Sequence, residues 1–200
     1  MDFLPGGELF THLRDQHMLL EDAVRVYAAE MVLAIEYLHN HDVIHRDLKP
    51  ENVLLDADGH LRLTDYGLAK AGHRDEDRTN TLCGTNEYMA PEMLAGGGYG
   101  KAVDWWSFGA LLYEMLTGAP PFQAKERKRL YDKIMKSKLS LPQYLSAGCH
   151  SLLKGLLERN VERRLGAGKS TMFQSRGVVA IKKHRFFKGL NWQKLERKEV

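Results

Sequence analysis

The stretch that decides the fold is HRDLKPEN at residues 45–52, and thirteen positions after its final Asn52 the chain has Asp65. Between them lie two short apolar runs, residues 53–55 and 61–63, which are separated by the Asp-Gly-containing turn at residues 56–59. Such a turn between short apolar runs predicts a β-hairpin. The strands of a hairpin run out and back, so we expect Asn52 and Asp65 at the same open end.

The residue types at this open end indicate phosphate chemistry. Asn52 and Asp65 offer oxygen ligands, one of them anionic, which suit a Mg²⁺ ion that carries a triphosphate. Asp47 is placed to accept a proton or to orient a hydroxyl, and Lys49 can neutralise phosphate charge. A lone Asp or Asn is usually a turn or cap residue, but the complete set at these spacings favours a functional site.

The composition sets broad limits on the class of protein. The chain has 200 residues, of which 44% are hydrophobic, and this favours one domain with one sizeable core. Its two cysteines, Cys83 and Cys149, are too few for a disulfide framework and fit a reducing compartment, the cytoplasm or also the nucleus. No apolar run reaches the roughly 18 residues of a membrane span, so we expect none.

The charge is uneven along the chain. The net charge is +3, and residues 178–200 hold seven Lys and Arg against two Glu, or +5, which leaves −2 for the remainder. A basic end can contact nucleic acid or an acidic membrane surface, but a solvated amphipathic end is the simpler interpretation. No aromatic stacking platform accompanies the charge, so we expect no nucleic-acid partner.

The hydrophobic pattern predicts a mainly α fold. Apolar residues recur every three or four positions over residues 21–39, which indicates a helix with one buried face. Residues 103–117 are apolar almost all round, so we expect a central buried helix, with Asp104 capping neighbouring amides and Gly118 ending it. We expect further helices near residues 127–136 and 149–159, and a mobile loop at 72–80. The prediction is a helical bundle around one buried helix, with a short hairpin that carries the catalytic and metal loops.

These motifs resemble the C-terminal lobe of a eukaryotic protein kinase. Ala90-Pro91-Glu92 looks like the anchor of the activation segment, and Arg164 is similar to the arginine that pairs with that glutamate. Residues 81–85 (TLCGT) and 87–89 (EYM) resemble the AGC group of serine/threonine kinases. Residues 101–122, 164–168 and 186–198 look most like the seventy-kilodalton ribosomal-protein kinase, with the cyclic-AMP-dependent kinase a close relative. The resemblance implies a partial catalytic domain at 1–187 (hinge and C-lobe) and the start of a C-terminal extension at 188–200.

The resemblance also implies roles for single residues. Asp47 would be the base or hydroxyl-orienting group, and Lys49 would contact the transferring phosphoryl group. Lys49 together with Thr85 resembles the serine/threonine class. Mg²⁺ would be held by Asn52 and Asp65. The remaining ATP contacts would come from the backbone of Asp2 and Leu4, from the apolar side chain of Leu54 under the adenine, and from Glu8, Glu51 and Thr64.

Regulation and substrate preference are further expectations. Phosphate placed on Thr81 by an upstream kinase would pair with Arg46 and Lys70 and order the loop; the alternative is an unmodified loop threonine. Four glutamates match acidic positions of the AGC group: Glu8, Glu51, Glu87 and Glu114. They predict protein substrates with Arg or Lys N-terminal to the target Ser/Thr. The alternative is a solvated surface role for each glutamate.

Some features depart from the resemblance. Tyr66 stands where the family usually has Phe, so its hydroxyl needs a partner; Asn86 and Arg185 stand where Pro is common. The insert at residues 169–177 departs from the usual length or composition. Residues 166–171 look like the tail of a phosphate-binding loop but lack its context, and Val179-Ala180-Ile181-Lys182 spells the kinase nucleotide-lysine motif too late in the chain. We interpret residues 179–182 as a surface segment.

The first residues, MDFLPGGELF, look like a hinge that begins inside a domain. No glycine-rich loop, strand lysine or regulatory-helix glutamate precedes residue 45 in this sequence. We therefore expect a partial kinase domain whose Met1 is an internal methionine and whose activity alone is weak or absent. The competing hypothesis is a lobe-only protein that binds substrates or regulators without catalysis.

Overall fold

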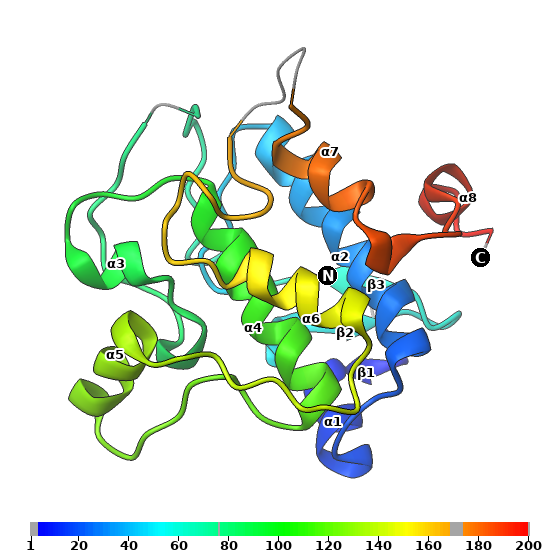
Figure 1. Ribbon diagram of the computed structural model, residues 1–200. Coiled ribbons are helices and arrows are strands. Elements are labelled where there is room, and N and C mark those ends of the chain that lie inside the picture. Colours follow the sequence, from blue (N-terminus) through cyan, green and yellow to red (C-terminus); the bar gives the residue numbers. More distant parts are fainter. Residues whose placement is uncertain (1–3, 76, 169–173, 200) are drawn as a thin grey trace.

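The centre of the fold is helix α4 (Ala102–Thr117), as its apolar sequence predicts. We describe a computed structural model, in which residues 4–75, 77–168 and 174–199 are placed. Twelve of the 16 residues of α4 are buried, and Gly118 ends the helix in the left-handed conformation with φ 80°. One side of α4 packs on α2 (Glu21–Asn40) and α6 (Ala147–Leu156) (Figure 1). Its opposite side, with Trp106 and Ala110, packs with residues of α3 (Pro91–Ala95) and α5 (Arg127–Lys136).

The long helices follow the sequence-based expectation. Both α2 and α5 form where the apolar spacing predicts them. Helix α6 differs from the expected range of 149–159, because it begins and ends earlier. The side chain of Ser146 accepts a hydrogen bond from the Cys149 amide at 3.0 Å and so caps the helix at its start. Arg159 lies beyond the helix, where its side chain donates to the carbonyls of Ile134 and Ser137.

The predicted hairpin is confirmed. Strands β2 (Val53–Leu55) and β3 (Leu61–Leu63) pair antiparallel, with Val53 opposite Leu63. A third strand, β1 (Gly7–Glu8), pairs with β2, so the sheet has three strands in the order β1-β2-β3. Strand β1 was not predicted, because two residues are too few to show a period of two. Beyond the paired strands, the Thr64 amide donates to the Asn52 carbonyl at 2.9 Å, so the two chain segments stay paired up to the end that carries Asn52 and Asp65.

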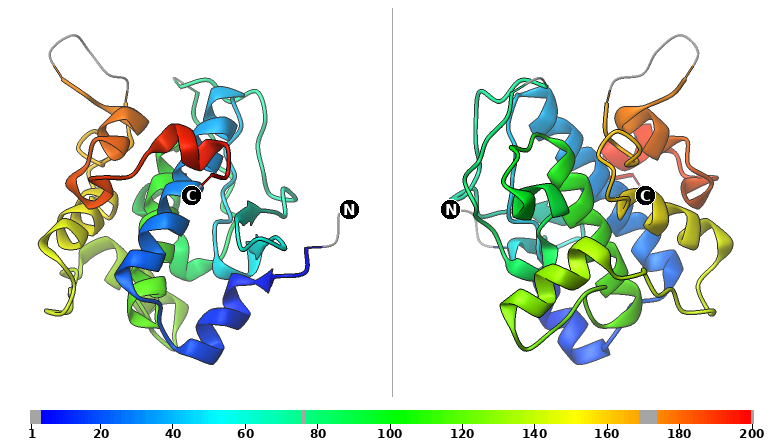
Figure 2. Two further views of the ribbon diagram at one scale, coloured as in Figure 1. Left: turned by 90° about the vertical axis from the view of Figure 1, so that its right-hand side faces the viewer. Right: turned by 60° about the vertical axis from the view of Figure 1, so that its left-hand side comes forward.

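Four short helices also escaped prediction: α3 and, in addition, α1 (Leu9–Gln16), α7 (Gly177–Lys182) and α8 (Trp192–Glu196). Residues 179–182, which we expected to form a surface segment, belong to α7; Val179 is exposed as expected, whereas Ile181 is fully buried. Lys182 is paired with Glu36 of α2 at 2.5 Å. In Figure 2, α7 and α8 (orange and red) lie against α2 on the side away from α5. Lys182 thus pairs with α2 and not with a residue of the hairpin.

The loop predicted at residues 72–80 contains no helix or strand within its described part. It is nevertheless anchored, which the prediction of a mobile loop missed. The amides and carbonyls of Thr79 and Tyr99 bond to each other at 3.0 Å in both directions, and the His73 amide donates to the Asp42 carbonyl at 2.8 Å. Because His73 and Thr79 are buried, the loop is fixed near each end.

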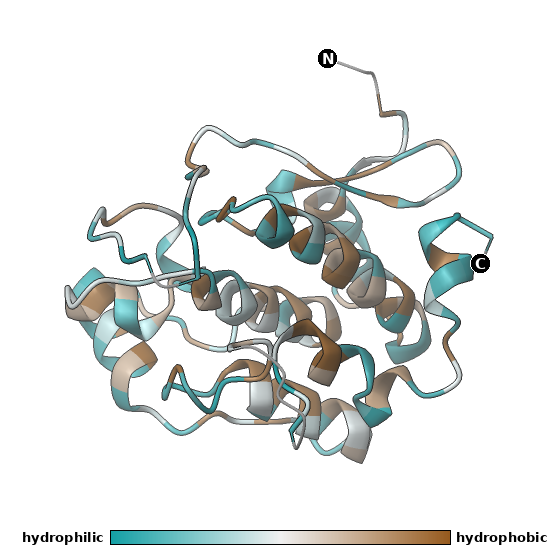
Figure 3. Cartoon of the chain, turned by 90° about the horizontal axis from the view of Figure 1, so that it is seen from above, coloured by the Kyte–Doolittle hydropathy of each residue, from teal (hydrophilic) through white to brown (hydrophobic). Residues whose placement is uncertain are grey.

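The hydropathy of the ribbon follows this packing. Figure 3 shows brown, apolar stretches along the packed helices and mostly teal, polar residues on α8. Among the described residues, no helix combines the length and the apolar character needed to cross a bilayer.

Candidate active site

Asp104 of α4 holds the HRDLKPEN loop in place. Its carboxylate accepts hydrogen bonds from the amides of His45 and Arg46, each at 2.9 Å, and from the His39 ring at 2.8 Å. We expected Asp104 to cap amides near the start of its own helix; instead, its side chain points to a loop almost sixty residues earlier in the chain. Burial raises the pKa of Asp104, but the His39 bond and the two amides outweigh it, so this pKa lies below its ordinary value.

Asp47 is a buried carboxylate with strong donors around it. Its Oδ1 accepts bonds from the Thr85 hydroxyl at 2.8 Å and the Thr85 amide at 2.9 Å, and Lys49 Nζ lies 3.2 Å from its Oδ2. Burial raises the pKa of Asp47, but the bonds from Thr85 and Lys49 together lower it below the ordinary value. Asp47 is therefore ionised at neutral pH. Thr85 reaches it because Gly84, with φ 97°, passes so close to the loop that an added Cβ would lie 2.5 Å from the Arg46 carbonyl oxygen.

The expected metal ligands lie at the open end of the hairpin. The side-chain nitrogen of Asn52, Nδ2, donates to the backbone carbonyl of Asp47 at 2.8 Å and to its carboxylate at 3.2 Å. The side-chain oxygen of Asn52 is thus left for a cation. Asp65 is exposed, with φ 56°; among the placed residues, its one hydrogen bond is accepted by Oδ1, at 3.1 Å from the Gly67 amide. Within the described residues no three His, Cys, Asp or Glu side chains gather as a metal cage. Two oxygen ligands fit Mg²⁺, which usually takes one or two protein ligands together with phosphates and waters.

The residues expected to contact ATP are divided between two places. Glu8 of β1 lies opposite Leu54 of β2, and Thr64 donates its hydroxyl to the Asn52 carbonyl at 3.1 Å. The Leu4 carbonyl accepts the Gly7 amide at 3.2 Å, and Asp2 lies outside the described residues. Glu51 instead lines a pocket beyond Thr85. The residues of the insert from 169 to 173 also lie outside the described residues.

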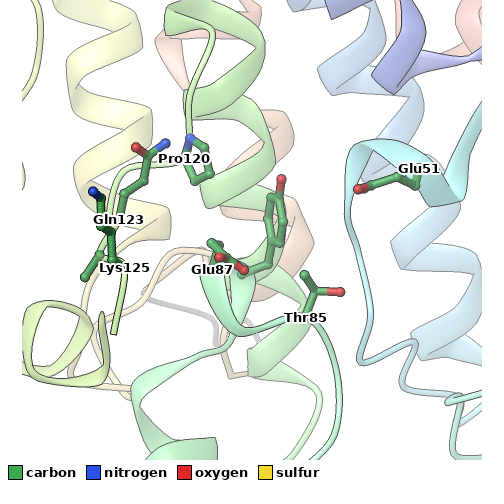
Figure 4. A pocket seen from close by; sticks show the side chains of 8 residues that line it. Glu51, Thr85, Glu87, Pro120, Gln123 and Lys125 are labelled. Atoms are coloured by element: carbon green, nitrogen blue, oxygen red, sulfur yellow. The ribbon is translucent and has the colours of Figure 1, made fainter. Parts of the chain in front are cut away.

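That pocket has a volume of about 680 Å³ (Figure 4). Its lining residues are Glu51, Thr85, Glu87, Tyr88, Pro120, Gln123, Ala124 and Lys125. The Tyr88 hydroxyl donates to Glu114, whose pKa is raised above its ordinary value by burial first and then by the charges of Glu51 and Glu87. The structure thus brings together three of the four glutamates predicted to bind substrate. Glu8, on β1, does not line the pocket.

The predicted regulatory residues are linked through Tyr99, which the sequence analysis missed. The Tyr99 hydroxyl donates to the Thr81 carbonyl at 2.6 Å and lies 3.5 Å from an Arg46 nitrogen. Lys70 donates to the Thr79 hydroxyl at 3.0 Å, two residues before the exposed Thr81. No local spacing marks Tyr99, because its partners come from three separate segments.

Two smaller expectations are confirmed by hydrogen bonds. Arg164 makes a two-point bond to Glu92, at 2.5 and 2.8 Å, as the resemblance implies. The Tyr66 hydroxyl finds its partner in the Leu63 carbonyl at 3.1 Å. At the other departures, Asn86 accepts a bond from the Tyr131 hydroxyl at 2.9 Å, and Arg185 donates to the Ala147 carbonyl at 2.6 Å.

A buried Asp beside Lys, next to an Asn and Asp oxygen pair at the end of a hairpin, defines the catalytic lobe of a phosphotransferase of the kinase type. The sequence model of the protein kinase domain matches residues 1–187, and the chain belongs to this family.

The curated relatives that the chain matches are serine/threonine kinases. The chain is 54% identical over all its 200 residues to the serine/threonine-protein kinase AtPK2/AtPK19 of Arabidopsis thaliana, and covers 41% of that protein. It is 51% identical over 192 residues to the ribosomal protein S6 kinase beta of Caenorhabditis elegans, which is 96% of this chain and 34% of the relative. It is 50% identical over 200 residues, 26% of the relative, to the mouse (Mus musculus) ribosomal protein S6 kinase alpha-2. The predicted resemblance to ribosomal-protein kinases is confirmed, and the chain spans less than half the length of these relatives.

Proposed function

We propose that the chain carries the phosphoryl-transfer site of a serine/threonine protein kinase that uses ATP and Mg²⁺. The observation that carries this proposal is the ionised, buried Asp47, held by Thr85 and Lys49 beside the free oxygens of Asn52 and Asp65. A non-catalytic binding module has no physical need for this complete set. The competing hypothesis of a lobe-only binding protein is therefore the weaker one.

Each residue then has a defined part in the reaction. Asp47 orients the substrate hydroxyl and accepts its proton while the hydroxyl oxygen bonds to the γ-phosphorus and the bond to the leaving ADP oxygen breaks. Lys49 neutralises charge on the transferring group. Thr85 fixes the carboxylate through its two bonds to Oδ1. Asn52 and Asp65 would hold Mg²⁺, which supplies further neutralisation of phosphate charge when bound.

We propose substrates with basic residues N-terminal to the target Ser or Thr. The support is the pocket next to Thr85, where Glu51 and Glu87 stand close enough to raise the pKa of Glu114. Arginine would meet these carboxylates with charge-assisted bonds. We also propose that the protein works in a reducing compartment, the cytoplasm or also the nucleus, since Cys83 and Cys149 are both free thiols.

We propose that these 200 residues bind nucleotide weakly by themselves. A glycine-rich loop and a strand lysine, which contact phosphates in kinases, are not among them. If two charge-assisted contacts of about 1.5–3 kcal/mol each are missing, nucleotide affinity falls about 10²- to 10⁴-fold. The test of the proposed function is therefore made at millimolar MgATP: the chain should phosphorylate a serine peptide that contains arginines, and Asp47→Asn should lower the transfer about 10²- to 10⁴-fold.

Regulation at Thr81 is a further part of the proposal. Thr81 is linked to Arg46 through the Tyr99 hydroxyl, and it lies two residues after Thr79, which accepts a hydrogen bond from Lys70. A phosphate on Thr81 would replace its neutral hydroxyl with an anion that can pair with both Arg46 and Lys70. We expect phosphorylation of Thr81 by an upstream kinase to raise the transfer rate and to slow amide hydrogen exchange in residues 77–82. The response should be lost in Thr81→Val and reduced in Arg46→Ala, but retained in Arg62→Ala on β3. Equal rates and equal exchange before and after phosphorylation would refute it.

A further inference from the structure

The substrate pocket holds unpaired charges of both signs. Within the described ranges, Glu51, Glu87 and Lys125 all line the pocket, and none of them forms a hydrogen bond or an ion pair with another described residue. All three are therefore available to a ligand. The predicted binding of basic substrate residues gives a role to the two glutamates only. Lys125 has no role in the function proposed above.

The two signs are separated in space. In Figure 4, Glu51 and Thr85 lie on one side of the pocket and Lys125 on the opposite side, with Glu87 between them. Thr85 is bonded to Asp47, so its side adjoins the place where the target hydroxyl would be held. Lys125 therefore stands at the end of the pocket that is farther from the chemistry.

The surroundings of Lys125 strengthen its positive field. It lies two residues before α5, which has no acidic side chain in its first turn, and Lys128 on that turn is exposed. Glu126 is occupied by Arg129, with 3.2 Å between Oε2 and Nε, and Arg127 lies over the Tyr131 ring. Nearby negative charge is thus partly neutralised, and the far end of the pocket is cationic.

We infer that the pocket selects peptides with two kinds of charge: basic residues close to the target hydroxyl, and an anionic side chain farther from it, on the same side, that meets Lys125. This inference rests on the proposed function and refines its substrate class. Lys125 would act by attraction and also by repulsion, since a basic residue at the same peptide position would face a like charge. The anion can be a carboxylate or a phosphate, because both have the charge that Lys125 requires.

The expected effect is modest because Lys125 is exposed. A solvent-exposed ion pair changes affinity about 1.5- to 5-fold, and salt screens it. Binding is therefore best measured at low ionic strength, by fluorescence anisotropy of labelled peptides on the full 200-residue chain. Binding does not require phosphoryl transfer, so weak catalysis leaves the measurement intact.

The experiment uses a serine peptide with two arginines N-terminal to the target serine. Each position on the far side of the arginines from this serine is varied in turn, one per peptide, and is Glu, phosphoserine, Ala or Arg. At the position that reaches Lys125, the wild-type chain should bind the Glu and phosphoserine peptides about 1.5- to 5-fold more tightly than the Ala peptide, and the Arg peptide least. Lys125→Glu should reverse this order and Lys125→Ala should abolish it. The matched control Lys138→Glu, also an exposed lysine but outside the pocket lining, should preserve it.

The outcomes separate the two claims. An identical ranking of the peptides by the wild-type chain and Lys125→Glu, at every scanned position, overturns this inference. Peptides whose arginines are replaced by Ala test the substrate class itself: undiminished binding overturns the basic preference, and absence of binding by every peptide overturns both. Tighter binding of phosphoserine than of Glu identifies phosphate as the preferred anion, whereas equal binding identifies any single anionic group.

Discussion

At the residue scale, the site depends on neighbours that set the charge of buried carboxylates. Burial raises the pKa of both Asp47 and Glu114. Thr85 and Lys49 reverse this effect at Asp47, whereas Glu114 has one hydroxyl donor, Tyr88, and the repulsion of Glu51 and Glu87. Under the same desolvation, Asp47 therefore stays ionised, whereas Glu114 holds its proton to a higher pH.

This difference predicts a pH dependence. Because the folded-state pKa of Glu114 is raised, its contribution to the free energy of unfolding is present below its unfolded-state pKa and lost as the pH rises through the folded-state value. As the pH rises from the ordinary pKa of glutamate through the folded-state pKa of Glu114, the Glu114 carboxylate ionises. Binding of an arginine peptide should tighten over this pH range. Glu114→Gln should remove both changes, measured by urea unfolding and by peptide anisotropy from about pH 4 to pH 8. Profiles identical to wild type would show that Glu114 does not titrate in this way.

At the element scale, the close packing of α4 on α6 depends on Gly109. A Cβ added there would lie 2.8 Å from Leu156 Cβ and 3.2 Å from two side-chain carbons of Leu157. Gly109 is buried in the helix contact that places Asp104, and through it the HRDLKPEN loop, against the core. Any displacement of α4 would be transmitted to that loop.

We expect Gly109→Ala to lower the free energy of unfolding by about 1–3 kcal/mol, the usual cost of overpacking a tight core. The matched control is Gly97→Ala, where an added Cβ meets no atom within 4 Å and the backbone is not in the left-handed region. Chemical denaturation of the two variants checks the difference. Equal stability of Gly109→Ala and wild type would mean that α4 and α6 can separate at no cost.

The elements also show what the sequence can predict. Helices α2 and α4 are long enough for several apolar repeats, and the Asp-Gly turn marks the hairpin, so these three were predicted correctly. Helices α1, α3, α7 and α8 have five to eight residues each, too few for a clear period. At the site, Asp47, Asn52 and Asp65 share one short segment and its hairpin, so spacing alone locates them. The contacts of Asp104 and Tyr99 join distant segments and leave no local pattern.

At the scale of the whole molecule, α4 and Arg164 connect the two halves of the site. The Arg164 guanidinium binds Glu92, donates to the Ala102 carbonyl at 2.9 Å and lies over the Trp106 ring, 5.2 Å from its centroid. It thereby fixes the segment that carries Thr85, Glu87 and Tyr88 to the core. Asp104, on the same helix, fixes the loop that carries Asp47. One buried helix thus sets the position of the pocket beside Thr85 relative to the Asp47 carboxylate.

The central claim is that Asp47 makes this lobe a phosphotransferase. The most direct measurement is transfer of labelled phosphate from MgATP to an arginine-containing serine peptide by the 200-residue chain, its Asp47→Asn variant and the matched control Asp58→Asn at the exposed hairpin turn. We predict slow, Mg²⁺-dependent transfer that falls about 10²- to 10⁴-fold in Asp47→Asn and is unchanged in Asp58→Asn. Equal transfer by the wild-type chain and Asp47→Asn, or transfer by neither, would contradict the account.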